Sequence, residues 1–170
     1  MAAKANDEWF STWFDSPYYH ILYGHRDDSD AQHFIDQLTS LPWFKSASKV
    51  ADVCCGKGRH SYYLHSKGFE VTGYDLSPAS IQHCLESTKP GLEFRVHDMR
   101  NPYSDMDFDV VLNLFTSFGY FETGSDNQKA ISNMAESLKP SGRLVIDFLN
   151  AQLVAKQLVP HESISTPATD

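Results

Sequence analysis

"ADVCCGKGRH", residues 51–60, is the point where an apolar run gives way to two glycines and then to two basic residues. The run at 49–55 is typical of a buried strand, and the residues from Arg59 onward are typical of a helix. Gly56 and Gly58 lack Cβ, so the backbone of this strand-to-helix turn can adopt positive φ and approach a ligand closely. The two preceding cysteines are too small to refill that space. The sequence therefore predicts a thin, ligand-binding corner.

Strand and helix patterns alternate on either side of this corner. Alternation of this kind predicts right-handed βαβ units and a mainly parallel sheet with helices on both faces, an α/β Rossmann-like fold. In such a sheet, ligands lie at the carboxyl ends of the strands. We expect five strands, at 49–55, 69–75, 92–98, 108–115 and 143–150, and helices at 59–68, 77–88 and 125–142.

The first 45 residues differ from the rest because aromatic side chains dominate them. Aromatic residues at 9, 10, 13 and 14 recur at helical spacing, Pro17 should stop or bend that helix, and a second helix is expected at 30–39. The stripe could simply pack onto the core or could cover a ligand, and the two are compatible. We divide the chain into an N-terminal aromatic helical lid, 1–45, and a nucleotide-binding domain, 46–170.

Composition restricts the function. The chain has 170 residues, 41% of them hydrophobic, and a formal net charge of −8 at pH 7. An acidic protein lacks the basic surface that nucleic-acid binders use, so nucleic acid is not favoured as a partner. No apolar run approaches the roughly 18 residues of a membrane span, and no signal peptide is recognisable. Three cysteines, two of them adjacent, indicate free thiols and a cytoplasmic location.

The acids before and after the corner distinguish two classes of ligand. A dinucleotide fingerprint, G-x-G-x-x-G, requires a third glycine, but Ser61 occupies that position. Asp52 lies four residues before Gly56, giving D-x-x-x-G-x-G, and Asp75 ends the second strand 19 residues after that glycine (75 − 56). A carboxylate there can accept hydrogen bonds from ribose hydroxyls, although "DLSPAS" is also a helix-capping sequence.

"DVCCGKGRHS" resembles the first motif of the class I S-adenosylmethionine-dependent methyltransferases, and the resemblance extends from about Trp13 to Asn150. It implies that the glycine turn lies under the methionine part of the cofactor, that Asp75 binds the ribose and that Leu76 packs on the adenine. It also implies that Asp98, in "VHDM", accepts a hydrogen bond from the adenine amino group. The full cofactor-binding set that we expect is Asp52, Cys54, Gly56, Gly58, Arg59, Asp75, Leu76, His97, Asp98, Met99, Asn113, Leu114, Phe115, Tyr18 and Arg26.

"LNLFTSFGYF", 112–121, resembles the run that lines the meeting point of methyl donor and acceptor in this family. Its alternate apolar residues are expected in the core. Transfer from a sulfonium is an in-line displacement in which the protein mainly positions donor and acceptor. A base is needed only if the acceptor is protonated. Candidates for the acceptor pocket are Asn113, Thr116, Ser117, Phe118 and Tyr120, and candidates for the catalytic base are His20, His25, Tyr18, Tyr19 and Tyr120.

The sequence supports one leading function and two alternatives. The leading prediction is an S-adenosylmethionine-dependent methyltransferase with a small-molecule acceptor. The alternatives are a cofactor-binding module without turnover and a nicotinamide-dependent oxidoreductase with a degenerate fingerprint. A cofactor-binding module without turnover is an alternative because the family normally adds a C-terminal antiparallel hairpin, which we expect to be missing after 143–150. An exposed fifth-strand edge could then support a homodimer. The cysteine and histidine spacings predict no metal site.

Overall fold

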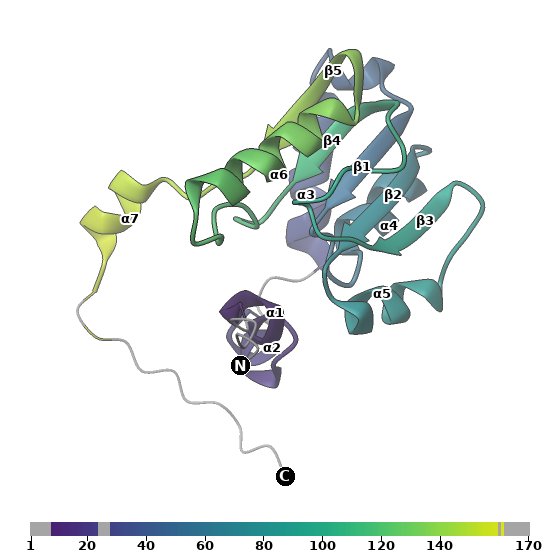
Figure 1. The fold of residues 1–170 in the computed structure, drawn as a ribbon. Helices are drawn as coiled ribbons and strands as arrows, with labels where there is room; N and C mark the ends of the chain where they lie inside the picture. The colour runs from purple at the N-terminus through teal and green to yellow at the C-terminus, as the bar shows by residue number, and fades with distance from the viewer. Residues whose placement is uncertain (1–7, 24–27, 160, 162–170) are drawn as a thin grey trace, which may run out of the picture.

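The computed structural model describes residues 8–23, 28–159 and 161. Its helices and strands follow one another in the alternating order that the sequence predicts (Figure 1). They are α1 (Trp9–Trp13), α2 (Pro17–Tyr23), α3 (Asp28–Ser40), the 3-10 helix η1 (Phe44–Ser46), β1 (Lys49–Val53), α4 (Arg59–Ser66), β2 (Glu70–Asp75), α5 (Pro78–Leu85), β3 (Leu92–Val96), β4 (Phe108–Asn113), α6 (Gly124–Glu136), β5 (Leu138–Ile146) and α7 (Ala151–Gln157).

The five strands form one parallel sheet in the order β3-β2-β1-β4-β5. The predicted Rossmann-like fold and its parallel sheet are therefore confirmed. β1 lies at the centre, and the chain builds outward on one side through β2 and β3, then crosses to β4 on the other. The strand order thus switches at β1, directly beside the glycine turn, and a switch point is where open α/β sheets bind ligands.

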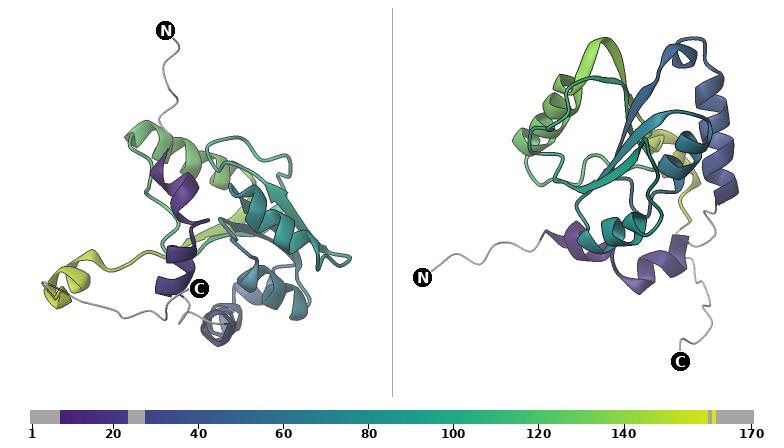
Figure 2. Two further views of the ribbon diagram at one scale, coloured as in Figure 1. Left: turned by 90° about the horizontal axis from the view of Figure 1, so that it is seen from below. Right: turned by 90° about the vertical axis from the view of Figure 1, so that its right-hand side faces the viewer.

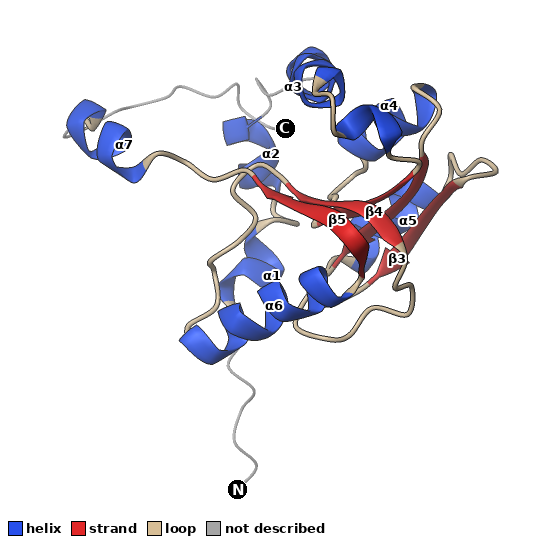
Figure 3. Cartoon of the chain, turned by 90° about the horizontal axis from the view of Figure 1, so that it is seen from above, coloured by secondary structure: helices blue, strands red, loops and turns tan. Residues whose placement is uncertain are grey.

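Helices cover both faces of the sheet, and each face has its own apolar core. α3, α4 and α5 pack on one face, where Phe44, Leu64 and Leu92 are buried. α6 packs on the other face, where Phe108 and Met134 are buried. Figure 3 shows α3 and α4 on one side of the strands and α6 on the opposite side. Burial on both faces explains why the central strands read as nearly continuous apolar runs.

The predicted boundaries of the last helix and of the fifth strand are wrong, because β5 runs from Leu138 to Ile146 and not over 143–150. We expected the helix at 125–142 to end at Pro140 and Gly142, but α6 ends at Glu136 and β5 already begins at Leu138. The strand starts early because Leu138 pairs with Phe108, after which the register shifts before Arg143 pairs with Val110. The intervening residues form an irregularity in the edge strand, where a proline without an N–H is tolerated.

The helix starts and breaks follow local signals. Ser77 caps α5 by accepting a hydrogen bond from the N–H of Ser80 at 3.0 Å, and Pro78 occupies the first turn, as predicted. α1 ends at Trp13 and α2 begins at Pro17, which confirms the predicted break. None of the helices in the described ranges is long and apolar enough to cross a membrane.

The two ends of the described chain lie in different places. α1 lies near α6, below the sheet in Figure 1 and beside α6 in the left view of Figure 2. α7, which follows β5, projects away from the sheet in Figures 1 and 3. The described residues that follow Ile146 therefore add a helix and not another strand to the sheet.

Candidate functional site

A cavity of about 550 Å³ opens at the carboxyl edge of the sheet. Its walls come from the turn after β1, the ends of β2 and β3, the loop after β4 and the N-terminal segment. A volume of this size is within the usual range of small-molecule sites. The position is the one that the strand order and the glycine turn predict.

The glycine turn forms the floor of this cavity. Gly56 lines the cavity with φ of +55°, and a Cβ placed on it would meet nothing within 4 Å. Gly58 has φ of +80°, but a Cβ there would lie 3.0 Å from the rings of Phe94 and Tyr62. Gly56 therefore leaves space for a ligand, whereas Gly58 leaves space for packing and begins α4. Cys54 also has a positive φ, 63°, which is uncommon outside glycine.

Asp75 at the end of β2 is held by backbone donors. The N–H of Gly56 donates to Oδ2 at 2.7 Å, and the N–H of Ser77 donates to Oδ1 at 2.8 Å. Burial raises the pKa of the Asp75 carboxyl, and these two bonds act against that rise. The carboxylate thus ties the glycine turn to the start of α5. An ionised carboxylate has about four acceptor sites, so acceptor capacity remains for a ligand in the cavity.

A buried acid and a buried histidine lie beneath the turn. Asp52 is 1% exposed and accepts a hydrogen bond from the Ser61 hydroxyl at 2.6 Å. Burial raises the pKa of Asp52 to about 6, and the Ser61 bond acts in the opposite direction. Burial lowers the pKa of His60 to about 4, assisted by the positive charge of Arg59. Asp52 accordingly fixes α4 against β1.

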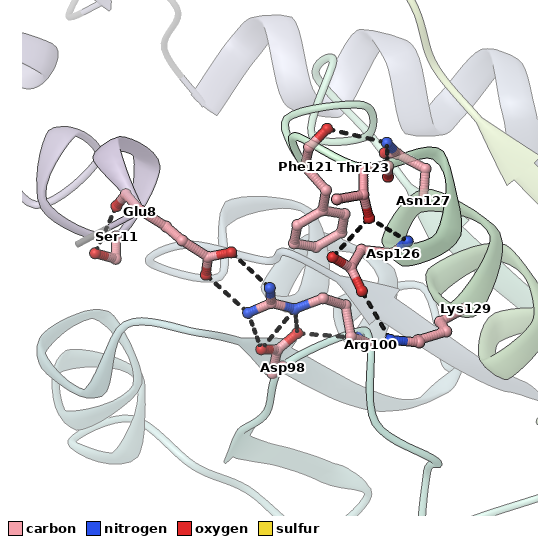
Figure 4. A network of polar contacts seen from close by, with 9 residues as sticks. All are labelled: Glu8, Ser11, Asp98, Arg100, Phe121, Thr123, Asp126, Asn127 and Lys129. Carbon is pink, nitrogen blue, oxygen red and sulfur yellow. Dashed lines mark hydrogen bonds and ion pairs between the residues drawn. The ribbon is translucent and has the colours of Figure 1, made fainter. Parts of the chain in front are cut away.

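Asp98, after β3, is paired with Arg100 (Figure 4). The Nη2 of Arg100 lies 2.6 Å from Asp98 Oδ2, and its Nε lies 3.0 Å from both carboxylate oxygens. Burial acts to raise the pKa of Asp98, but the Arg100 hydrogen bonds outweigh it and hold that pKa below its usual range. Asp98 is therefore an ionised acceptor at the cavity wall. Nearby, His97 lines the cavity and contacts the carbonyl of Asn101 at 3.2 Å.

The loop after β4 is strained where it meets the cavity. Phe115 and Thr116 have φ of 58° and 54°, which is rare for residues with bulky or branched side chains. Asp147 stabilises this conformation: its Oδ2 accepts from the N–H of Phe115 at 3.0 Å and its carbonyl accepts from the N–H of Thr116 at 3.1 Å. The ring of Phe115 then lies 4.9 Å from the Arg59 guanidinium. Such clustered strain is typical of functional sites.

The N-terminal segment forms the remaining wall. Phe14 packs on Tyr19 and Tyr120, with ring centroids 5.0 and 5.4 Å apart, and all three line the cavity. Asp15 contributes a polar contact, accepting from the Ser77 hydroxyl at 2.6 Å. α3 plays a different part, because its Ile35 lies in the core with α4. The N-terminal residues that line the cavity thus lie within 8–23, together with Asp28 at the start of α3.

The structure brings together most of the residues that the sequence predicted for the site, and it places others elsewhere. The predicted residues that line the cavity are Asp52, Cys54, Gly56, Arg59, Asp75, Leu76, His97, Asp98, Met99, Leu114, Phe115, Ser117, Tyr19 and Tyr120. Gly58, Asn113, Thr116, Phe118 and Tyr18 are not among the lining residues. Arg26, His25 and the side chain of His20 lie outside the described part of the chain.

Asn113 and Tyr18, which were predicted for the site, do not line the cavity. Asn113 is fully buried and donates from Nδ2 to the carbonyl of Val53 at 3.1 Å, so it joins β4 to β1. Tyr18 is 69% exposed. We predicted it as a ligand contact, but its neighbour Tyr19 faces the cavity instead. Tyr18 and Tyr19 differ in this way because adjacent residues of a helix point in different directions.

Sequence reasoning missed several cavity residues. Phe10, Ser11 and Phe14 lie in the stretch with aromatic residues at helical spacing. That spacing would have predicted them as lining residues if we had assigned which face of the helix points to the cavity. Lys57, Tyr62, His83 and Asp28 gave no such signal, because only the packing of separate elements brings them to the cavity. The lining residues that were not predicted are Phe10, Ser11, Phe14, Asp15, Asp28, Val53, Cys55, Lys57, His60, Tyr62, Ser77, Ser80, His83 and Phe121.

Thiols and possible metal ligands complete the description. Cys54, Cys55 and Cys84 are free, as the sequence predicts. In the part of the chain that the structure describes, no three His, Cys, Asp or Glu side chains are grouped so that they could hold a metal ion.

Known proteins resemble this chain in both sequence and structure. YqeM of Bacillus subtilis, named as a methyltransferase, is 35% identical over 129 residues, covering 71% of this chain and 51% of YqeM. The dTDP-3-amino-3,4,6-trideoxy-alpha-D-glucopyranose N,N-dimethyltransferase of Streptomyces venezuelae is 30% identical over 101 residues, covering 59% of this chain and 42% of that enzyme. The chain therefore spans about half the length of the relatives it matches.

A solved structure adds the same similarity in three dimensions. The SAM-bound structure of CalS10, an amino pentose methyltransferase from Micromonospora echinaspora, matches with a TM-score of 0.66 and 26% identity, covering 79% of this chain and 57% of CalS10. The sequence model of the methyltransferase domain matches residues 50–142. Those residues run from β1 to β5 and include the glycine turn, Asp75 and Asp98. The chain belongs to the class I S-adenosylmethionine-dependent methyltransferase family.

Proposed function

We propose that the cavity binds S-adenosylmethionine and that the protein transfers its methyl group to a small-molecule acceptor. One observation carries the proposal: Gly56, Asp75 and Asp98, from three successive strand ends, line a single cavity. A nicotinamide oxidoreductase has no comparable use for the carboxylate of Asp98. The family membership supports the same cofactor, because CalS10 is named as SAM-bound.

The residues present fit the cofactor. The open space above Gly56 suits the methionine part, which a side chain at that position would displace. Asp75 retains acceptor sites for the ribose hydroxyls after its two backbone bonds. Leu76 and Met99 offer apolar surface on either side of the adenine, and Asp98 offers an acceptor for its amino group.

When bound, S-adenosylmethionine supplies a reactive methyl group on a sulfonium. The chain's own part is to orient that group, exclude water and position the acceptor. Phe115, Tyr19 and Tyr120 surround the end of the cavity that leads toward the N-terminal segment. Among the candidate bases, Tyr19 and Tyr120 line the cavity, so we propose their hydroxyls as the groups that contact the acceptor.

We further propose that the acceptor is a small amine. Aromatic ring faces attract ammonium groups, and carboxylates pair with them. The cavity wall combines the rings of Phe14, Tyr19 and Tyr120 with the carboxylates of Asp15 and Asp28. Several relatives are named as N-methyltransferases, including those of Streptomyces venezuelae and Rattus norvegicus. Competition between candidate amines and alcohols in a transfer assay with labelled cofactor tests this class of acceptor.

The segment 8–23 is the proposed lid. It is too apolar for a free tail, and Phe10, Phe14 and Tyr19 contribute to the cavity wall. A cover of this kind would exclude water from the sulfonium. Deleting residues 1–27 should weaken cofactor affinity more than it weakens folding, because α3 and its core contacts remain. Intact cofactor affinity in a deletion variant whose free energy of unfolding is lowered would show that the segment serves only as core.

Calorimetry distinguishes the leading function from its alternatives. S-adenosylhomocysteine should bind the purified chain with measurable heat, and NAD should not. Binding of NAD alone would favour the oxidoreductase. Binding of S-adenosylhomocysteine without transfer to any acceptor would favour a cofactor-binding module. Detection of labelled methyl product with an amine acceptor supports the full proposal.

Self-association is the remaining part of the proposed function. β5 is an edge strand of the sheet, and Phe148, Leu149 and Leu153 beyond it are 54%, 46% and 50% exposed. Unpaired edges with neighbouring apolar surface favour pairing with another chain. We therefore propose a homodimer through β5. Light scattering at micromolar concentration should give twice the chain mass, and a stable monomer would contradict the dimer.

A further inference from the structure

Arg100 connects two parts of the molecule that are far apart in sequence (Figure 4). Its Nη1 lies 2.6 Å from Glu8 Oε1 and its Nη2 lies 2.8 Å from Glu8 Oε2, a bidentate contact across 92 positions of sequence. The same guanidinium binds Asp98 at the end of β3. Glu8 immediately precedes α1, so this one side chain joins the cavity wall to the proposed lid.

Aromatic packing fixes the guanidinium in place. Its carbon lies 4.6 Å from the ring centroid of Phe121, which is 7% exposed and lines the cavity. Phe121 in turn contacts Phe10 of α1 edge-on, with centroids 5.5 Å apart. The Arg100 side chain is 22% exposed, so its two ion pairs are only partly screened by water. Glu8, Arg100 and Asp98 thus form a junction between α1 and the strand ends, which we call the Arg100 junction.

Both oxygens of Asp98 already accept from Arg100. Oδ1 accepts from the backbone N–H and Nε, and Oδ2 accepts from Nε and Nη2. The Nε donor is shared between the two oxygens, at 3.0 Å from each. Since Asp98 lines the cavity, a ligand donor can take over one half of this shared contact while the Nη2 bond remains.

We propose that Arg100 is a positioning residue that couples occupation of the Asp98 end of the cavity to closure of α1 over it. The proposal rests on the proposed cofactor site. Arg100 orients Asp98 through its Nε and Nη2, and it orients Glu8 through its outer nitrogens. A ligand that fills the cavity beside Asp98 excludes water from the carboxylate–guanidinium pair, which strengthens that pair and, through it, the Glu8 contact. A closed α1 in turn holds Arg100, and therefore Asp98, in the ligand-binding geometry.

Coupling of this kind is reciprocal. If closure of α1 raises ligand affinity by a given factor, ligand binding must favour closure by the same factor. Two quantities should therefore change together: the dissociation constant of S-adenosylhomocysteine and the hydrogen exchange of the α1 amides. A purely structural arginine would change neither one through Glu8.

The experiment uses Glu8→Gln and Arg100→Lys in the full chain. Their matched controls are Glu93→Gln and Arg95→Lys, which alter the ion pair between Arg95 and Glu93 on β3. Glu8→Gln removes one charge and should weaken S-adenosylhomocysteine binding about 3- to 10-fold while speeding α1 exchange by a similar factor. Arg100→Lys loses the fork geometry toward both acids and should have the larger effect, about 10-fold or more. The controls should leave both measurements unchanged.

The possible results are decisive. Parallel changes in affinity and α1 exchange support the coupling. Unchanged affinity and exchange in Glu8→Gln overturn it, whether or not Arg100→Lys folds. Weaker binding in Arg100→Lys, with Glu8→Gln equal to wild type, also overturns it, because Arg100 would then act on Asp98 alone. Failure of the wild type to bind S-adenosylhomocysteine contradicts the proposed function, whereas equal α1 exchange in ligand-free wild type and Glu8→Gln contradicts the junction itself.

Discussion

Asp75 and Asp98 lie at neighbouring strand ends and line the same cavity, but different kinds of hydrogen-bond donor hold their carboxylates. Asp75 accepts two backbone N–H groups, from Gly56 and Ser77, which lie close to it in the βαβ unit. Asp98 is held by the side chain of Arg100, which also contacts Glu8 in the N-terminal segment. One carboxylate belongs to a rigid motif, and the other belongs to a junction that includes a separate part of the chain.

The difference shows how one site can combine a fixed end and an adjustable end. Backbone donors around Asp75 move only if the turn itself unfolds. The Arg100 junction can open when α1 leaves, because α1 has only five residues and is held by side-chain contacts such as Phe10 on Phe121. Ribose recognition is therefore expected to be independent of the lid, and recognition at Asp98 is expected to depend on it.

The largest effect should come from breaking the fixed end at Gly56. Gly56→Val places a β-branched residue at φ of +55° and directs its side chain into the cavity. We expect affinity for S-adenosylhomocysteine to fall on the order of 100-fold by calorimetry. Gly68→Val is the matched control, because Gly68 also has positive φ and open space but lies away from the cavity. Equal affinity in the two variants would contradict the role of Gly56.

Asp52 and His60, both buried beneath the glycine turn, should control the pH dependence of the free energy of unfolding. The pKa of Asp52 is about 6 in the folded protein against 3.8 as its reference value, so between these values the folded state binds more protons and its stability falls as pH rises. The pKa of His60 is about 4 against 6.5, so the folded state binds fewer protons and its stability rises with pH. In the wild type these two contributions oppose each other.

Substituting Asp52 and His60 one at a time reveals the contribution of each to the pH dependence of stability. From pH 4 to pH 6.5, Asp52→Asn should gain roughly 3 kcal/mol of unfolding free energy relative to the wild-type curve. His60→Gln should lose a similar roughly 3 kcal/mol relative to the wild type as pH rises from 4 to 6. Urea denaturation across this range measures both. Parallel curves for all three proteins would show that neither group has a shifted pKa.

Conservative substitutions of Asp75 and Asp98 compare the fixed end and the adjustable end of the cavity directly. Asp75→Asn and Asp98→Asn each remove a charged acceptor, and each should weaken S-adenosylhomocysteine binding about 10-fold. Hydrogen exchange should separate them: α1 amides exchange at the wild-type rate in Asp75→Asn and faster in Asp98→Asn. Equal α1 exchange in the two variants would remove the distinction between a fixed and an adjustable end.

The smallest effect on binding is expected at Gly58. Gly58→Ala adds a Cβ 3.0 Å from Phe94 and Tyr62 at φ of +80°, which should lower the free energy of unfolding by about 1–2 kcal/mol. Affinity should change less than about twofold, because Gly58 does not line the cavity. Urea denaturation and calorimetry measure the two quantities. A large loss of affinity with an unchanged free energy of unfolding would show that Gly58 contacts the ligand.

Local sequence signals predicted the fixed end well. The glycine turn, the acid at the end of β2 and the Ser77 cap all depend on residues within one βαβ unit, and the structure shows the contacts among them. The parallel sheet followed from the alternation of strands and helices. Gly58 was predicted as a ligand contact but does not line the cavity, and a glycine required by packing and one required by a ligand look alike in sequence.

The adjustable end could not be predicted in the same way. Asp98 was identified by its place after a strand, but nothing in "HDMR" indicates that Arg100 also reaches Glu8. That contact depends on how α1 crosses the sheet edge, which tertiary packing decides. The early start of β5 was missed for a related reason: Leu138 pairs with Phe108 although proline and glycine follow it.

A crystal structure with S-adenosylhomocysteine tests the central claim most directly. We predict ribose hydroxyls within hydrogen-bonding distance of Asp75, the amino-acid end of the ligand over Gly56, and the adenine amino group at Asp98 with the Arg100–Glu8 contact intact. Ligand density outside this cavity, or a ribose turned away from Asp75, would contradict it.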